Sequence, residues 1–219
     1  MKVKFIFLLA SFAAAFASCK KDSVTGKGSI QTQERNVSAF TKVATQGSTT
    51  IYIVQGADFE VKAKGYANLL PYLKTTVENG VLSVRYENTS NVRNDNSEVF
   101  ITMPVLTGLS SGGSGDMHVT GEFSGNTNFD AHISGSADIT VEKGSAENFV
   151  LHSSGSGSFG SFGFTSQNAD IAISGSGEAK ITVGQKLKVK INGSGSVYYK
   201  GNPATVDNDI SGSGKVIKQ

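Results

Sequence analysis

The sequence has little cysteine, little net charge and no apolar run long enough to cross a bilayer. Cys19 is the only cysteine among 219 residues, so no disulfide can form within the chain. Its 20 basic and 18 acidic residues give a formal net charge of +2 at pH 7. This near balance argues against nucleic acid as an electrostatic partner. The apolar run at residues 5–16 is too short for a membrane span.

Residues 1–18 have the features of a secretory signal. Lys2 and Lys4 form a charged stretch before the apolar run. Small residues directly before Cys19 resemble a lipobox, in which the cysteine is acylated and becomes the mature N-terminus. Phe16 replaces the branched aliphatic residue usual in that motif, and an ordinary signal peptide is the alternative. Acylation at Cys19 predicts a protein that is anchored to a membrane but does not span it.

The stretch after the cysteine is polar and has no sustained apolar pattern. We therefore predict that residues 19–36 form the lipidated N-terminus and a flexible tether. Without residues 1–18 the chain keeps 18 basic and 18 acidic residues. The remaining length is that of one ordinary domain, which we assign to residues 37–219.

A serine- and glycine-rich pentapeptide occurs six times in the second half of the chain. The copies begin at residues 112, 134, 154, 174, 192 and 211. Internal repetition at a near-constant period indicates a repeat architecture. Residues one and three positions before each copy are mostly apolar, whereas the position between them holds His132, His152 and Lys190. Alternation of this kind predicts strands with one buried face, and it puts the glycines on the inward side.

A unit of about 20 residues with two short strands cannot bury its apolar face alone, but a stack of such units can. We therefore predict an all-β fold, a single-stranded right-handed parallel β-helix with coils of about 20 residues. Inward glycines fit the places where the wall of a coil bends or narrows. A propeller would need a repeat of roughly 40 residues, and helical repeats would not be rich in glycine.

Residues 37–109 lack the pentapeptide but are also rich in predicted strands. Residues 50–54, 59–63 and 99–103 each fit a strand. Asn79-Gly80 between alternating apolar residues is a strong signal for a β-hairpin. Residues 66–73 predict one helical turn or a capping loop. We expect this region to supply early coils and to cover the N-terminal end of the stack, since an open β-edge invites aggregation.

Five segments of this region, followed by the Ser-Gly repeats, resemble the putative auto-transporter adhesin head domain (head GIN domain) common in Bacteroidetes lipoproteins. The matching segments are residues 39–43, 51–56, 66–70, 78–82 and 99–104. The resemblance covers residues 36–216. It implies a β-helix, a cell-envelope location and an adhesin role, and it carries over no catalytic residues.

His132 and His152 occupy equivalent repeat positions one coil apart. Parallel stacking would place their imidazoles about 5 Å apart on the outer wall, where two imidazoles could share a metal ion. The next two coils have Ala172 and Lys190 at this position, and no carboxylate joins the pair there. We therefore predict neither a metal site nor a cofactor.

Asp116, Asp138 and Glu178 form an acidic ladder that Ser158 interrupts. Glycan-active enzymes of the β-helix class use acidic clusters beside a basic residue, which here would be Lys180 or Lys143. Fold alone does not establish function, and a solvated outer wall explains these charges more simply. We therefore predict that the chain is not an enzyme, an interpretation that a deep groove around these residues would overturn.

Aromatic residues near the repeats are the remaining candidates for ligand contact. With the two histidines they make up the predicted ligand-facing set: His132, His152, Tyr198, Tyr199, Phe162 and Phe164. We interpret the chain as a non-catalytic lipoprotein of the cell envelope, at the outer membrane, with an adhesive or structural role and a protein or glycan ligand. The alternative is a periplasm-facing lipoprotein that binds another envelope component.

Overall fold

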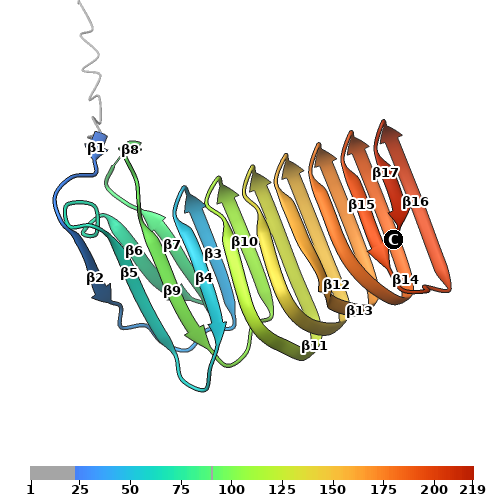
Figure 1. Cartoon of the computed structure of the whole chain (residues 1–219), viewed down its shortest axis with the longest axis horizontal. Coiled ribbons are helices and arrows are strands. Elements are labelled where there is room, and N and C mark those ends of the chain that lie inside the picture. The colour runs from blue at the N-terminus through green and yellow to red at the C-terminus, as the bar shows by residue number, and fades with distance from the viewer. Residues whose placement is uncertain (1–22, 90) are drawn as a thin grey trace, which may run out of the picture.

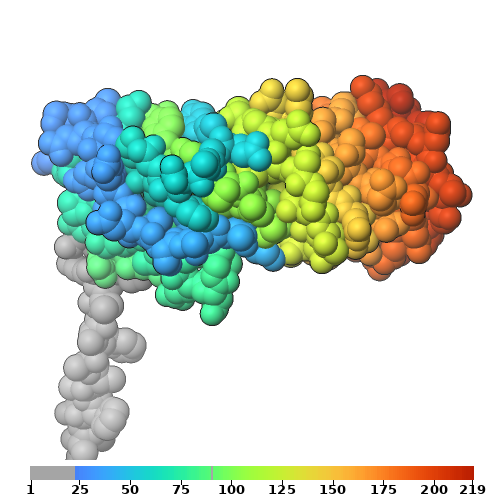
Figure 2. All heavy atoms as spheres, turned by 90° about the horizontal axis from the view of Figure 1, so that it is seen from below, coloured from blue at the N-terminus to red at the C-terminus, as the bar shows by residue number. Residues whose placement is uncertain are grey.

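A computed structural model describes residues 23–89 and 91–219, which form 17 strands (Figure 1). These residues include no helix, and hence none that could cross a membrane. The predicted signal, the lipobox-like sequence and Cys19 lie outside the described residues. The molecule is elongated, with the N-terminal strands at one end and the last coils at the other (Figure 2).

The repeat half of the chain is a parallel β-solenoid. Each coil pairs in parallel with the next, and equivalent residues of the repeats lie in register, as Leu151 does with Ile171. The solenoid has about six turns with coils of about 20 residues, which confirms the predicted fold class. Its strands are β10 (Gly108–Gly113), β11 (Met117–Gly135), β12 (Ile139–Gly155), β13 (Ser158–Gly175), β14 (Glu178–Gly193), β15 (Ser196–Lys200), β16 (Thr205–Gly212) and β17 (Lys215–Lys218).

Each long strand from β11 to β14 bends once, so it contributes to two opposing walls (Figure 1). The Ser-Gly pentapeptide makes the other corner of each coil. Gly155 has a φ of 119°, and a Cβ on this residue would lie 2.3 Å from the carbonyl oxygen of Gly135 in the preceding coil. Only glycine fits this corner, because a side chain would meet both backbone strain and the neighbouring coil. The first glycine of the pentapeptide therefore lies in the turn itself, and the second, as at Gly157, is the one that points inward and is buried.

The core is a continuous column between the two walls. Leu151 and Ile171 are fully buried within it. A cluster of phenylalanine rings fills the column beside the bend, with ring centroids 4.8 Å apart for Phe129 and Phe164 and 4.9 Å apart for Phe149 and Phe159. The alternating pattern of the repeats thus produces the buried face that it predicts.

Two further coils come from the N-terminal region, and they stack out of sequence order. One consists of β3 (Lys42–Gly47) and β4 (Thr50–Gln55), and the other of β7 (Val81–Tyr86) and β9 (Glu98–Met103). β3 pairs with both β10 and β7, and β4 pairs with both β11 and β9. The coil of β3 and β4, which comes first in the sequence, therefore lies between the coil of β7 and β9 and the first coil of the repeat half.

Antiparallel strands cover the N-terminal end of the stack, as expected. β6 (Leu73–Glu78) pairs with β7 through a hairpin in which Asn79 and Gly80 have φ values of 51° and 75°. Both residues have a left-handed backbone conformation, which a two-residue hairpin turn requires in order to match the twist of the strands. β5 (Glu60–Tyr66) pairs with β9, and β2 (Ile30–Glu34) pairs with β5. A turn at residues 67–72 joins β5 to β6.

The predicted tether is corrected for the part of it that the structure describes. β2 belongs to the cap, and β1 (Ser23–Thr25) pairs in parallel with β8 (Asn91–Arg93). These strands attach through main-chain hydrogen bonds, and most of their side chains are exposed. Edge strands of this kind need no alternating apolar pattern, which is why the sequence pattern did not indicate them.

Candidate functional site

One flat wall of the solenoid carries most of the polar repeat positions. We call it the histidine wall; it consists of β7, β3, β10, the C-terminal halves of β11, β12, β13 and β14, and β16. The opposite wall consists of β9, β4, the N-terminal parts of β11 to β14, β15 and β17. Strict alternation sends every second residue of each strand outward, and the in-register stacking turns these residues into rows that run along the solenoid axis.

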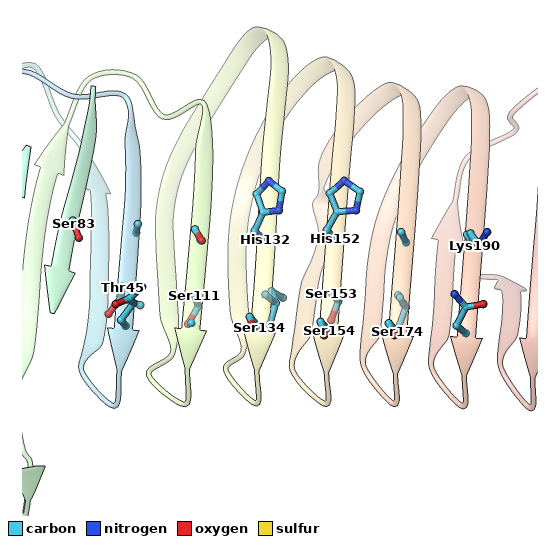
Figure 3. A pocket seen from close by; sticks show the side chains of 18 residues that line it. Thr45, Ser83, Ser111, His132, Ser134, His152, Ser153, Ser154, Ser174 and Lys190 are labelled. Atoms are coloured by element: carbon cyan, nitrogen blue, oxygen red, sulfur yellow. The ribbon is translucent and has the colours of Figure 1, made fainter. Parts of the chain in front are cut away.

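A shallow groove of about 570 Å³ runs along the histidine wall and crosses seven strands, from Ser83 on β7 to Asn192 on β14 (Figure 3). Two outward rows provide its polar side chains. The first row is Ala44, Ser110, His132, His152, Ala172 and Lys190, and the second is Gln46, Gly112, Ser134, Ser154, Ser174 and Asn192.

His132 and His152 lie side by side in the middle of the groove (Figure 3). Their ring centroids are 5.3 Å apart and their planes differ by 20°. Both side chains are exposed, so their ring nitrogens are open to a ligand. The sequence correctly predicted that the rings stack on the outer wall. In residues 23–89 and 91–219 no group of three or more His, Cys, Asp or Glu side chains could hold a metal ion.

Three carboxylates of the same wall lie outside the groove and are paired with lysines. Asp130 accepts a hydrogen bond from Lys42 at 2.8 Å, and Asp170 accepts one from Lys188 at 2.9 Å. Lys190 at the end of the groove lies 3.4 Å from Asp209. The described side chains that line the groove include no carboxylate. The groove therefore presents hydroxyl, amide and imidazole groups and one ammonium group.

The serines near the groove have two roles, according to whether the side chain points inward or outward. Ser111 and Ser153 point inward, and their hydroxyls donate to the carbonyl oxygens of Gly115 and Gly157 at 3.1 and 3.4 Å. These two residues brace the corner of the coil. Ser134 and Ser154 point outward and are exposed, so their hydroxyls are free to meet a ligand.

The acidic ladder lies on the opposite wall and is occupied by structural bonds. Asp138 Oδ1 accepts hydrogen bonds from the backbone N–H and the hydroxyl of Ser158, at 3.0 and 2.6 Å. Asp116 Oδ1 accepts one from the N–H of Asp138, at 2.9 Å. Glu178 forms an ion pair with Lys180. Each carboxylate thus secures a neighbour and does not converge with the others on a catalytic centre.

Two of the predicted ligand-facing aromatics are corrected. Phe164 is fully buried and packs 4.8 Å from the Phe129 ring centroid, because the register shift between Gly160 and Thr165 turns its side chain inward. Tyr199 is partly buried against the core. Tyr199 lies two residues after the buried Val197, so both side chains point to the same face of the strand. The sequence could have indicated this direction.

The other two predicted aromatics do not join the groove. Lys200 Nζ lies 4.6 Å from the ring centroid of Phe162, and Lys180 Nζ lies 5.8 Å from that of Tyr198. Both aromatic side chains are partly exposed. The structure therefore gathers the two predicted histidines with the wall serines and leaves these aromatics apart from them.

An aromatic stack on the opposite wall was missed by sequence reasoning. Tyr52 stacks on Phe100 and on His118, with ring centroids 5.1 and 5.3 Å apart. These residues lie on β4, β9 and β11, and the first two strands belong to coils that stack out of sequence order. The three rings face one another, so they strengthen this wall and offer little ring face for stacking with a ligand.

Comparison with known proteins extends these observations. The family model described as putative auto-transporter adhesin, head GIN domain, matches residues 39–203. No curated protein matches the chain.

Solved structures from Bacteroides and Parabacteroides species share this fold. A putative adhesin from Bacteroides fragilis has a TM-score of 0.71 and 21% identity, over 89% of this chain and 99% of that chain. A putative lipid binding protein from Parabacteroides distasonis has a TM-score of 0.59 and 22% identity, over 90% and 100%. A putative adhesin from Parabacteroides merdae has a TM-score of 0.53 and 20% identity, over 90% and 99%. Likenesses at these identities show a shared fold.

Proposed function

The chain belongs to the putative auto-transporter adhesin, head GIN domain, family, and we propose that it is a non-catalytic binding module of the cell envelope. The groove on the histidine wall carries this proposal. It is long and open, whereas small-molecule sites enclose most of their ligand. An open groove of this shape suits an extended polymer.

The repetition of the wall supports a ligand that lies along the solenoid axis. Neighbouring strands are about 4.8 Å apart, so the same kinds of hydrogen-bonding groups recur at that interval. The hydroxyls of Ser134, Ser154 and Ser174 and the amide of Asn192 follow one another in a single row. This interval is close to the length of one sugar unit in an extended glycan, whose hydroxyls can both donate and accept hydrogen bonds. A polysaccharide is therefore the ligand class that we propose.

The acidic ladder supports a non-catalytic function over glycan cleavage. Glycosidases of the usual kind hold two carboxyl groups on either side of the bond that they cleave. Here Asp116 and Asp138 accept backbone hydrogen bonds, and Glu178 is paired with Lys180.

The groove is tested with the mature protein and a panel of soluble neutral and acidic polysaccharides, with binding measured by affinity electrophoresis. Ser154→Trp places a bulky side chain in the centre of the groove. Thr140→Trp is the control, because Thr140 is exposed on the opposite wall. We expect the wild type and the control to bind a polysaccharide and Ser154→Trp to lose most of that binding. Equal binding by the two variants would contradict the proposal.

We also propose that Cys19 carries the lipid that anchors the protein at the outer membrane. The lipobox-like sequence supports this anchor. Protease treatment of intact cells is the test, with Cys19→Ala as the control. Cleavage of the wild type on whole cells, together with release or mislocalisation of the control, would support a surface adhesin. Protection until the outer membrane is opened would favour the alternative, a periplasm-facing lipoprotein that binds another envelope component.

A further inference from the structure

The charges around the groove differ from those of the chain as a whole. The chain has 18 acidic residues, but the described side chains that line the groove include no carboxylate. Among the described residues, three carboxylates lie in the adjacent outward row. Asp130 and Asp170 are each bonded to a lysine, and Asp207 on β16 lies beyond the groove, in register with Lys188. An anion beside the histidine pair would therefore meet hydrogen-bond donors without an unpaired carboxylate next to it.

The end of the groove near β14 lies in the most basic part of the molecule. Residues 178–219 contain seven lysines and three acidic residues, whereas residues 23–177 contain nine basic and 14 acidic residues. Lys190 belongs to this basic part and lines the groove. Its partner Asp209 is 3.4 Å away, and both side chains are more than half exposed. Exposed pairs of this kind contribute little energy, so the ammonium group can turn to a bound anion.

The histidine pair forms a second cationic position when it is protonated. Histidine is the side chain whose charge ordinarily changes between about pH 5 and pH 8. Two protonated rings at a centroid distance of 5.3 Å repel each other, and a carboxylate beside both rings relieves that repulsion. Anion binding and proton uptake by the pair are therefore coupled, and each favours the other.

No unpaired carboxylate of the described residues lies next to the histidine pair, so the carboxylate that favours its protonation comes from the ligand. Ser110 and Ala172 flank the histidines within their own row, and Ser134 and Ser154 follow in the next row. The remaining neighbours are Val150 and Asp130 on the same strands and Asp170 on β13. Asp130 is bonded to Lys42, and Asp170 is bonded to Lys188. Lys190 lies two strands from His152, a distance of about 10 Å.

We infer that the groove binds an acidic polysaccharide that bears carboxylates, with one carboxylate beside His132 and His152 and another beside Lys190. The separation of about 10 Å between these two positions matches carboxylates two sugar units apart. Binding strengthens as the pH falls, because protonation of the histidine pair adds positive charge where the carboxylate lies. This inference rests on the proposed function, since it names the chemistry of the polymer in the same groove.

The test uses polygalacturonate and its fully methyl-esterified form, which have the same backbone and differ in charge. Binding to the mature protein is measured at about pH 5.5 and about pH 8. We expect polygalacturonate to bind about tenfold more tightly at the lower pH, as two added charges near one carboxylate allow. The ester binds weakly at both pH values. Lys190→Gln weakens polygalacturonate binding at both pH values.

A matched pair of variants isolates the histidines. The double variant His132→Gln, His152→Gln keeps hydrogen-bonding groups but cannot gain charge. His118→Gln is the control, because His118 lies on the opposite wall and is bonded to Thr140. We expect the double variant to lose the pH dependence, so that its binding at about pH 5.5 and at about pH 8 is the same. The control keeps the pH dependence of the wild type.

Three outcomes would overturn the inference. The first is equal binding of the ester and the acid, and the second is a pH dependence that survives in the double variant. In both cases the proposed function still stands if Ser154→Trp abolishes binding. The third is binding of neutral polysaccharides alone. The groove would then still be the binding site, but it would not recognise carboxylates. Failure of the proposed function is distinct from all three, because Ser154→Trp then binds as the wild type does.

Discussion

The repeat half and the N-terminal region build the same solenoid with different corners. In the repeat half, each corner is a glycine turn that stacks directly on the previous one, with the N–H of Ser156 donating to the carbonyl oxygen of Gly135 at 2.9 Å. In the N-terminal coil of β7 and β9, the corner is longer and includes β8 (Asn91–Arg93), and polar side chains hold it in place. Tyr86 donates to Asp95 at 2.7 Å and lies 2.6 Å from the Ser97 hydroxyl.

The difference shows how the two regions divide the work of the domain. Identical corners keep the coils in register, so outward residues form the straight rows that line the groove. Irregular corners allow strands to reverse, and antiparallel β2, β5 and β6 cover the end of the stack. We expect the repeat half to provide the binding wall and the N-terminal region to protect the edge of the sheet.

The largest expected effect is in the core of the repeat half. Phe164→Ala removes a fully buried ring that packs on Phe129 and Phe149, and we expect it to lower the free energy of unfolding by about 3–5 kcal/mol. Phe162→Ala is the matched control two residues away, and its loss should be about 1 kcal/mol because this ring is partly exposed. Urea unfolding measures both. Similar losses would mean that the bulge does not place these side chains as described.

The next effect compares the glycine corners of the two regions. A Cβ at Gly155 would clash with the backbone of the preceding coil, whereas one at Gly47, the equivalent position in the N-terminal region, meets nothing within 4 Å. We expect Gly155→Ala to cost about 2–3 kcal/mol and Gly47→Ala about 1 kcal/mol, since both residues have positive φ.

Gly160→Ala serves as the control for this pair, because its Cβ has only ordinary contacts. Its effect should stay within about 0.5 kcal/mol. Thermal unfolding of the three variants ranks their losses of stability directly. If Gly47→Ala cost as much as Gly155→Ala, backbone strain alone would explain the corners and direct stacking would not.

A smaller effect is expected at the N-terminal corner. Burial, followed by the hydrogen bond to Asp95, raises the pKa of Tyr86 above its ordinary value. The neutral phenol is therefore favoured in the folded state, and this stability is complete below the unfolded pKa of about 10 and is lost as the pH rises above it. Tyr86→Phe should cost about 1–2 kcal/mol at neutral pH, because Asp95 and the buried Ser97 each lose a hydrogen-bond partner.

The pH dependence distinguishes this role from simple packing. The stability difference between the wild type and Tyr86→Phe should narrow above about pH 10, because only the wild type has a phenol to ionise at this corner. Urea unfolding at pH 8 and pH 11 measures it. A difference that stays constant or widens would contradict the buried, hydrogen-bonded position of the hydroxyl.

The same two regions differ in how far their structure could be predicted. In the repeat half, spacing fixes which residues stack, so the fold class and the adjacent placement of His132 and His152 followed from the sequence. In the N-terminal region β4, β5, β6, β7 and β9 were predicted, but β3 was not. The order of the strands was not predicted either, because β4 and β9 become neighbours through long-range pairing. The strand Ile30–Glu34 was missed because it attaches by main-chain bonds, and Phe164 was misplaced because a bulge reverses its direction.

The proposed binding site was only partly predictable. The sequence identified the histidine pair, whereas the groove depends on seven strands whose outward rows align. Ser83 and Gln46 join this groove from the N-terminal coils, which carry no pentapeptide. The local sequence pattern indicates whether a side chain points inward or outward. Which residues share an outward row depends on the order in which the coils stack.

The most direct measurement is a chemical-shift map of the backbone amides during titration with trigalacturonate at about pH 5.5. Binding along the histidine wall predicts shifts that cluster on the outward rows of β10 to β14 and are largest around His132, His152 and Lys190. The opposite wall, including Tyr52 and His118, should stay unchanged. Shifts that cluster on the opposite wall or on the N-terminal cap, or no shifts at millimolar trigalacturonate, would contradict the assignment of the groove as a site for acidic glycans.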